Sequence, residues 1–141
     1  MNYKIIHIQK ICDQRGKLIF LESLKNVPFK IKRVYCIFDV QKNVPRGEHA
    51  HRNLEQAIIC LNGSCHFLLD NGLKKEEIML DDPQMMLYVG KNMWRKMYNF
   101  SDNCILMVLA SDFYDEKEYI RNYDEFLMGL QLSKHETKHK R

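Results

Sequence analysis

Apolar and polar residues alternate along most of the chain, and turn-forming residues separate the alternating runs. A period of two puts successive side chains on opposite faces of a strand, so each run predicts a half-buried β-strand. The runs are YKIIHI, KLIFLE, IKRVYCIFDV, EQAIICL, SCHFLLD, EEIML, QMMLYVG and CILMVLAS. Turn signals such as Asn62-Gly63 and Asp70-Asn71-Gly72 lie between them. Many short strands at this spacing predict an all-β sandwich or barrel.

The period changes near the end of the chain. From about Asp115 the apolar residues recur every three or four positions, which predicts an amphipathic helix. Asp115 followed by Glu118 fits a capping box, and Gly129 with the basic residues after it indicates a fraying end. We expect one domain over residues 1–132, with its helix from about 115, followed by a basic, disordered tail over residues 133–141.

Length and charge fit a single globular domain and narrow the classes of partner. At 141 residues the chain can hide about two-thirds of its unfolded surface. The net charge is +4, but the tail from Ser133 to Arg141 alone carries four basic residues against Glu136 and leaves the rest at about +1. A nearly neutral body argues against nucleic-acid binding. No apolar run approaches the ~20 residues that cross a bilayer, so no membrane span is expected.

The N-terminal residues and the cysteines indicate the cellular compartment in which the protein works. The N-terminus alternates, whereas a secretory signal needs a continuous apolar segment, so a strand is expected there. The five cysteines are odd in number and lack C-x-x-C spacing, which predicts neither a disulfide framework nor a zinc site. We expect a cytoplasmic protein.

A pair of histidines is the strongest chemical signal. His49 and His51 share one face of a strand, which in a closed barrel can be the interior, and Glu55 has the same parity unless a bulge intervenes. The three side chains can hold a metal, or the imidazoles can form an acid/base pair, or they can simply hydrogen-bond neighbours at the barrel mouth. Two same-face histidines close to Gly47 and Arg46 favour a functional pair.

The motif H-x-H-x3-E, with Gly47 before it and Asn62-Gly63 after it, resembles the first motif of the cupin superfamily of jelly-roll barrels. Metal-binding cupins usually add a histidine from a second motif, P-x-G-x2-H. The corresponding stretch, YVGKNMWRKMYNFSDN, contains neither histidine nor proline. The ligand set is therefore His49, His51 and Glu55 at most, and an acid/base pair without metal is the preferred hypothesis.

From about Lys4 to Phe126 the chain resembles the sugar-nucleotide 3,4-ketoisomerases, which act on dTDP-4-oxo-6-deoxy-glucose. The segments that carry the resemblance are DQRGKL, VPFKIKRVYCIFDV, PRGEHAHRNLEQAIICLNGSC, LYVGKNMWRKM and VLASDFYDEKEYIRNYDEFL. The resemblance implies a double-stranded β-helix with a C-terminal helix and a homodimer with exchanged N-terminal strands. It also implies catalysis without a metal or other cofactor, in the biosynthesis of a 3-amino-3,6-dideoxyhexose for surface glycans such as the lipopolysaccharide O-antigen.

The implied reaction is proton transfer between neighbouring carbons. The C4 ketone acidifies the C3 proton, so a base can generate an enediolate that is reprotonated at C4, with no redox cofactor. By resemblance, His49 is the base and His51 the acid or proton shuttle, although the roles can be reversed. Tyr35 can donate to the enediolate, but it is equally suited to an amphipathic strand.

The resemblance also implies residues that bind the substrate. Arg33 and Arg46 can contact the diphosphate, and Arg15 is expected near the sugar. Gln56 is polar in an apolar run, and Trp94 offers a flat face for sugar or base, although as the only tryptophan it can equally be a core residue. Arg95 follows Trp94 where the family often has histidine. Arg95 favours a gluco configuration at C4 of the product, whereas Arg15 is equally expected in galacto-forming members.

Two other functions share these features. A cupin sugar-nucleotide epimerase also uses a histidine base but leaves the carbonyl where it was. A non-enzymatic cupin would use the histidines only to recognise a sugar nucleotide. The position of the carbonyl in the product, or the lack of any product, separates the three hypotheses.

Overall fold

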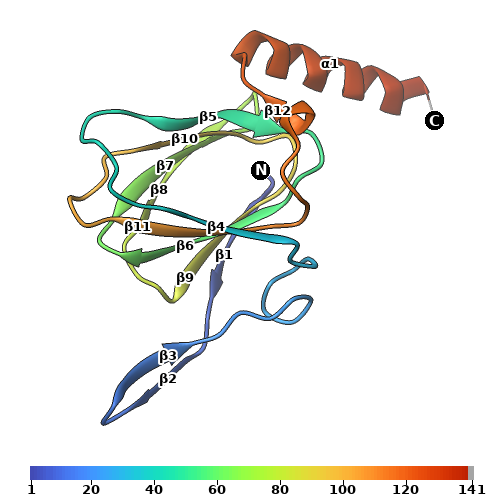
Figure 1. Ribbon diagram of the computed structural model, residues 1–141. Coiled ribbons are helices and arrows are strands. Elements are labelled where there is room, and N and C mark those ends of the chain that lie inside the picture. The colour runs from blue at the N-terminus through green and yellow to red at the C-terminus, as the bar shows by residue number, and fades with distance from the viewer. Residues whose placement is uncertain (140–141) are drawn as a thin grey trace.

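The computed structural model describes residues 1–139 and contains two antiparallel five-stranded sheets that face each other (Figure 1). One sheet has the order β1 (Tyr3–His7), β9 (Met85–Val89), β6 (Gln56–Asn62), β11 (Ile105–Ala110) and β4 (Arg33–Ile37). The other has the order β12 (Tyr119–Ile120), β5 (Arg46–His51), β10 (Trp94–Tyr98), β7 (Cys65–Asp70) and β8 (Lys75–Leu80). Neighbours that are distant in sequence make this a jelly roll, as predicted.

The core lies between the sheets because alternate residues of each strand point inward. Ile58 of β6, Phe67 of β7 and Leu106 of β11 are almost completely buried in this inner cluster. The other face of β6 is also covered, since Ala57 and Ile59 pack against a second cluster that includes Val27. β6 is therefore buried on both faces, and this makes it a rigid support for the side chains that it directs inward.

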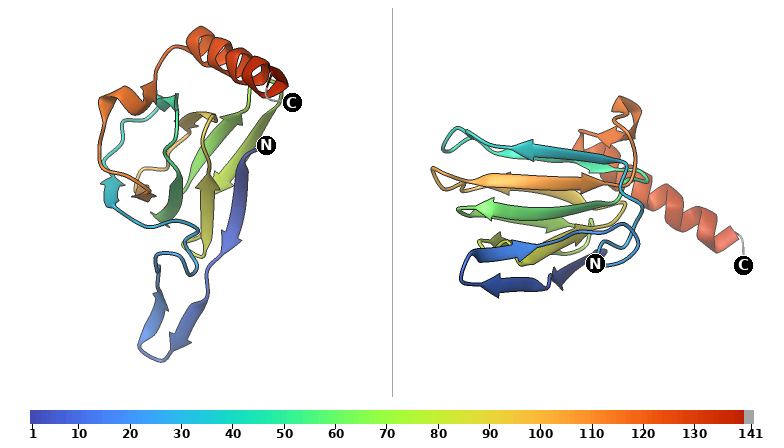
Figure 2. Two further views of the ribbon diagram at one scale, coloured as in Figure 1. Left: turned by 90° about the vertical axis from the view of Figure 1, so that its right-hand side faces the viewer. Right: turned by 60° about the horizontal axis from the view of Figure 1, so that its bottom comes forward.

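The hairpin formed by β2 (Lys10–Asp13) and β3 (Gly16–Ile19) projects from the barrel on the side opposite the C-terminal helix (Figures 1 and 2). Ile11 and Leu18 are cross-strand partners, and both are about half exposed, at 50% and 54%. A two-stranded hairpin is marginally stable by itself. Its apolar pair therefore lacks cover among residues 1–139 of a single copy.

The C-terminal helix begins later than the predicted start at about residue 115. Asp115 caps only a short 3-10 helix, η1 (Glu116–Glu118), and β12 follows it in extended conformation. The α-helix α1 spans Tyr123–His139, and Asn122 caps it by accepting a hydrogen bond from the Glu125 amide at 3.0 Å. Tyr119 and Ile120 are extended because they pair with β5, which satisfies their backbone groups outside any helix.

The end of the helix also differs from the expectation. α1 continues through Gly129 as far as His139, where the sequence predicted a fraying end and then a disordered tail. Lys140 and Arg141, the last residues of the predicted tail, lie outside the described residues. No helix within residues 1–139 is long and apolar enough to span a membrane.

The first half of α1 is anchored on the outer face of the second sheet. Phe126 is 1% exposed and packs in a cluster with Ala50, Ile120 and Trp94, with its ring centroid 5.9 Å from that of Trp94. The Tyr123 hydroxyl donates to Asp70 Oδ2 at 2.6 Å. The helix therefore holds β12 and the end of β5 in place.

We expect Phe126→Ala to destabilise the protein by about 3–5 kcal/mol, because it removes a fully buried ring and leaves a cavity under α1. Met128, on the same helix but 63% exposed, provides the control, and Met128→Ala should change stability by less than ~0.5 kcal/mol. Urea unfolding measures both. Equal losses in the two variants would show that α1 is not docked through Phe126.

Candidate active site

β5 directs His49 and His51 to the same side, as the period of two predicts. Their Nε2 atoms lie 3.0 Å apart, so one ring donates a hydrogen bond and the other accepts it. The pairing of β5 with β10 shifts register between Arg95↔His49 and Met97↔Arg46, which indicates a bulge in β5 around Gly47. The bulge lets Arg46, Gly47 and His49 all line the same cavity.

Gly47 is required at the bulge for two reasons. Its φ of +70° lies in the left-handed region, which residues with a Cβ atom rarely adopt. A Cβ at this position would also lie 2.7 Å from Met97 Cε and 3.6 Å from His49 Cε1. Any larger residue would therefore strain the backbone and displace the end of the Met97 side chain.

Tyr119 packs against both imidazoles. Its ring centroid lies 5.0 Å from that of His49 and 4.6 Å from that of His51. β12 brings it there, since Tyr119 is the cross-strand partner of His51. His51 is 0% exposed, whereas His49 lines the cavity, so only His49 of the pair is open to a ligand.

Both imidazoles are neutral at pH 7. Burial, reinforced by the positive charge of Arg95, lowers the pKa of His49 to about 3 and that of His51 to about 2. Arg95 itself is 2% exposed. Burial lowers its pKa to about 10, so it remains a cation at neutral pH. The pair therefore retains lone pairs that can take up a proton from a ligand.

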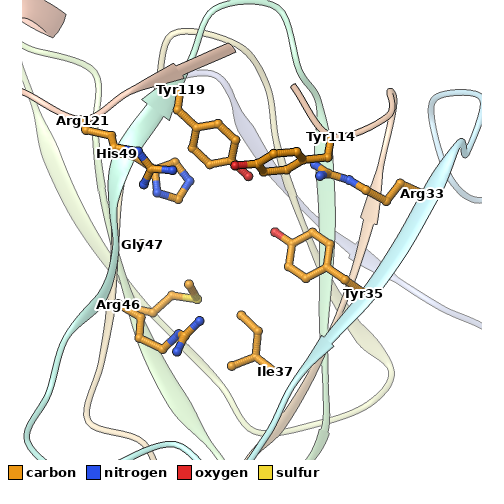
Figure 3. A pocket seen from close by; sticks show the side chains of 10 residues that line it. Arg33, Tyr35, Ile37, Arg46, Gly47, His49, Tyr114, Tyr119 and Arg121 are labelled. Atoms are coloured by element: carbon orange, nitrogen blue, oxygen red, sulfur yellow. The ribbon is translucent and has the colours of Figure 1, made fainter. Parts of the chain in front are cut away.

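The cavity has a volume of about 350 Å³ and opens between the two sheets (Figure 3). Ten residues line it, namely Arg33, Tyr35 and Ile37 from β4, Arg46, Gly47 and His49 from β5, Met97 from β10, and Tyr114, Tyr119 and Arg121 from the segment before α1. In Figure 3 the β4 residues face the β5 residues across the cavity, with the two tyrosines of the third segment between them.

Three guanidinium groups give the cavity a positive charge. The Arg33 guanidinium lies 5.3 Å from the Tyr35 ring centroid and 5.6 Å from that of Tyr114. Arg121 lies over the Tyr119 ring at 4.5 Å and pairs with Glu116 at 3.0 Å. Arg46 completes the set from β5. Such an arrangement suits an anionic ligand with several oxygen atoms, such as a diphosphate.

A buried network lies behind Tyr35. Gln56 Nε2 donates to the Tyr35 hydroxyl at 3.0 Å, and Arg95 Nη1 donates to Gln56 Oε1 at 2.7 Å. Arg95 Nη2 also donates to the Met93 carbonyl at 3.0 Å. Gln56 and Arg95 were expected to bind substrate, but they do not line the cavity and each is only 2% exposed. Gln56 contacts the cavity residue Tyr35, and the charge of Arg95 lowers the pKa of both histidines.

Trp94 does not line the cavity of its own chain. Trp94 precedes Arg95 on β10, and because successive side chains alternate, its ring lies on the outer face of the sheet. There it packs against Tyr123 and Phe126 of α1, with centroid distances of 5.3 Å and 5.9 Å. This packing fits the second interpretation of Trp94, in which it is a core residue.

Arg15 and Glu55 also lie away from the cavity of their own chain. Arg15 is near the tip of the β2–β3 hairpin, where it is exposed and pairs with Asp13 at 2.6 Å. Glu55 accepts a hydrogen bond from the Tyr88 hydroxyl and does not join the histidines. Within residues 1–139 no three His, Cys, Asp or Glu side chains gather in a geometry that could hold a metal ion.

Tyr114, Tyr119 and Arg121 are site residues that the sequence reasoning missed. It placed Tyr119 and Arg121 inside a helix that starts at about residue 115, and it gave Tyr114 no role. The alternation of Tyr119 and Arg121 around buried Ile120 is a strand signal, and Asn122 is a helix cap that follows it. Together these two features place the start of the helix after residue 121.

The chain is similar to known proteins over most of its length. A family model described as FdtA, WxcM-like, C-terminal matches residues 1–131. A TDP-4-oxo-6-deoxy-alpha-D-glucose-3,4-oxoisomerase of Aneurinibacillus thermoaerophilus is 55% identical over 126 residues, which cover 89% of this chain and 91% of that protein.

Two solved structures are similar over almost their whole length. A 3,4-ketoisomerase from Helicobacter canadensis superimposes with a TM-score of 0.91 and 52% identity, covering 93% of this chain and 98% of the other. The WlaRB TDP-quinovose 3,4-ketoisomerase of Campylobacter jejuni gives a TM-score of 0.88 and 58% identity, covering 90% and 98%. Both similarities extend well beyond the fold to the sequence itself.

The low histidine pKa values predict how stability depends on pH. Below pH 6.5, the ordinary histidine pKa, the unfolded chain binds protons on both residues, whereas the folded chain does not until pH about 3 and 2. The free energy of unfolding should therefore fall as the pH drops from 6.5 to 5, by up to about 1.4 kcal/mol per pH unit for each histidine.

The double variant His49→Asn/His51→Asn should show a clearly smaller slope over the same range in urea unfolding. His7→Asn is the control, because His7 is exposed on β1, and it should keep the wild-type slope. A wild-type slope in the double variant would mean that the pair is not buried in the neutral state.

Proposed function

The chain belongs to the FdtA family, WxcM-like, C-terminal, and we propose that it is a sugar-nucleotide isomerase that moves the keto group of TDP-4-oxo-6-deoxy-glucose from C4 to C3. The observation that carries the proposal is the neutral histidine pair at the wall of a cavity with three guanidinium groups. The pair supplies proton transfer, and the guanidinium groups match a nucleotide diphosphate.

Proton removal begins the reaction. His49, the histidine that lines the cavity, takes the C3 proton, and the electron pair left behind forms a C3–C4 double bond as the C4 carbonyl oxygen becomes an enediolate oxygen. A proton then returns to C4, and the proton of the 3-hydroxyl passes to the C4 oxygen. C3 becomes the new carbonyl, and C4 carries a hydroxyl group. His51, 3.0 Å from His49, receives and returns the proton as a shuttle.

Tyr35 stabilises the charge that develops. Its hydroxyl lies on the cavity side of β4 and can donate a hydrogen bond to the enediolate oxygen. Arg33, Arg46 and Arg121 hold the diphosphate, and the rings of Tyr114 and Tyr119 give the nucleotide sugar an apolar surface. No step requires a group that these side chains do not supply.

The working unit is a homodimer that exchanges its N-terminal hairpins. The half-exposed pair Ile11 and Leu18 supports this part of the proposal, because the hairpin has an apolar face that a single copy leaves uncovered. Exchange also gives Arg15 a role. A hairpin that reaches across to the second copy can bring Arg15 to the other cavity, near the substrate.

The product would serve an aminotransferase that makes a 3-amino-3,6-dideoxyhexose for surface glycans such as the lipopolysaccharide O-antigen. A ketone at C3 is the group that such an enzyme converts into an amine. We place the reaction in the cytoplasm, where the five free cysteines would remain reduced.

In heavy water the purified protein should convert TDP-4-oxo-6-deoxy-glucose into a 3-oxo product that carries solvent deuterium at C4, as read by NMR. His49→Asn should lower kcat by about 10³-fold, within the range for loss of a general base, whereas His7→Asn should leave kcat unchanged. Deuterium next to a carbonyl that stays at C4 would indicate an epimerase. Binding without exchange or turnover would indicate a non-enzymatic cupin.

Mixed dimers test the exchange of hairpins. Each homodimer of Arg15→Ala or of His49→Asn should have low activity, and sedimentation should first establish that the protein is a dimer. If hairpins are exchanged, a mixed dimer has one site with His49 from the Arg15→Ala chain and Arg15 from the other chain, so about half of the wild-type activity returns. Activity no higher than the mean of the two homodimers would contradict the exchange.

A further inference from the structure

We propose that Gln56, oriented by Arg95, is a positioning residue that forces the Tyr35 hydroxyl to donate its hydrogen bond into the cavity. The inference rests on the isomerase function proposed above and names how its oxyanion donor is controlled. It concerns two buried residues that do not line the cavity.

Arg95 determines the orientation of the Gln56 amide. A guanidinium group can only donate hydrogen bonds, so the atom of Gln56 that faces Arg95 must be the oxygen. Arg95 Nη1 lies 2.7 Å from Gln56 Oε1. The reverse orientation would put the amide NH₂ group against the guanidinium, with two donors in contact inside the core. The cation therefore fixes the amide.

The orientation of the Gln56 amide sets the direction of its hydrogen bond with Tyr35. With its oxygen turned to Arg95, Gln56 presents Nε2 to the Tyr35 hydroxyl at 3.0 Å and donates to it. The phenol oxygen thus accepts, and its own hydrogen must point elsewhere. Tyr35 lines the cavity, and Figure 3 shows its hydroxyl directed toward the side where His49 lies. The hydroxyl hydrogen is therefore free to point into the cavity, toward the substrate.

Burial of the Arg95 guanidinium costs free energy of folding. A guanidinium that is 2% exposed loses its hydration, and Arg95 Nε has no hydrogen-bond partner within the described residues. An apolar side chain at this inward position of β10 would avoid both penalties. Such an arrangement is expected where function, rather than packing, requires the charge.

The consequence for the reaction is a donor that is oriented before the substrate arrives. When negative charge develops on the sugar oxygen, the Tyr35 hydrogen already points toward it, so no reorganisation is needed in the transition state. The charge of Arg95 reaches the enediolate through Gln56 and Tyr35 without contact between Arg95 and the sugar. Any influence of Arg95 on the outcome at C4 would follow the same route.

Gln56→Glu tests the polarity of the network with almost no change in shape. The new carboxylate would still accept from Arg95, but its second oxygen would also accept, so the Tyr35 hydroxyl would turn to donate to it and away from the substrate. We expect kcat to fall about 100-fold, with KM and the affinity for TDP within about twofold of wild type. Tyr35→Phe should give a similar loss.

The double variant Gln56→Glu/Tyr35→Phe should be no slower than Tyr35→Phe alone, because Gln56 acts only through the Tyr35 hydroxyl. A Gln56→Glu enzyme with kcat within threefold of wild type would overturn the inference. So would a double variant whose loss is the product of the two single losses.

A measurement independent of turnover separates this inference from the proposed function. Tyrosine labelled with carbon-13 at Cζ reports whether the phenol donates or accepts, and Tyr35→Phe identifies the resonance. The Tyr35 signal should move in Gln56→Glu and stay in place in the distant variant His7→Asn. An unmoved signal would overturn the inference even if the wild type is an active isomerase, whereas an inactive wild type with a moved signal would reject only the function.

Gln56→Met covers the case in which Gln56→Glu does not fold. The thioether keeps the length of the side chain but cannot donate, so Tyr35 is no longer fixed and kcat should fall about tenfold with unchanged KM. The loss should vanish in the Tyr35→Phe background. An unchanged kcat in Gln56→Met would contradict a positioning role.

Discussion

The site depends on the burial of two uncharged imidazoles next to a permanent cation. His49 and His51 share a hydrogen bond of 3.0 Å, and burial together with the Arg95 charge makes protonation of either ring unfavourable at neutral pH. A base that is already neutral can accept a proton from carbon without first losing one to solvent. The same burial lowers the stability of the fold in acid, so the chemistry and the pH dependence of folding have one origin.

Three structural features hold the pair in this state. The bulge at Gly47 turns His49 toward the cavity, β12 brings the Tyr119 ring against both histidines, and α1 packs over the sheet that carries β12 and β5. On the opposite wall, β4 presents Tyr35 and Arg33. The jelly roll thus brings the two walls together between its sheets, and the C-terminal segment closes the space between them.

Strand periodicity was enough to predict the all-β fold and the common face of His49 and His51, because a period of two reports directly on side-chain direction. It could not predict the path of residues 115–122, where Tyr119 and Ile120 fit a helical period but are held extended by pairing with β5. Successive side chains of a strand alternate, so Trp94 and Arg95 lie on opposite faces of β10, and Trp94 packs under α1 as in the second of its two interpretations. Arg15 lies near the tip of a hairpin that projects from its own barrel, and the local sequence does not predict the direction of that hairpin.

The resemblance to ketoisomerases identified the residue types but not their roles in the cavity. Gln56 was assigned to the substrate because it is polar in an apolar run, and Arg95 because it stands where the family often has histidine. The structure connects both to Tyr35 from behind. Only the direction of each hydrogen bond reveals this, and the sequence does not contain it. Local pattern thus predicts which residues face inward, and tertiary packing decides which of them meet the ligand.

The most direct test of the central claim is a nitrogen-15 NMR titration of the histidine side chains in the folded protein, with His49→Asn and His51→Asn used for assignment. We expect both rings to keep the shifts of neutral imidazole from pH 8 down to at least pH 5. Protonation of either ring of the pair near pH 6.5 would contradict the central claim.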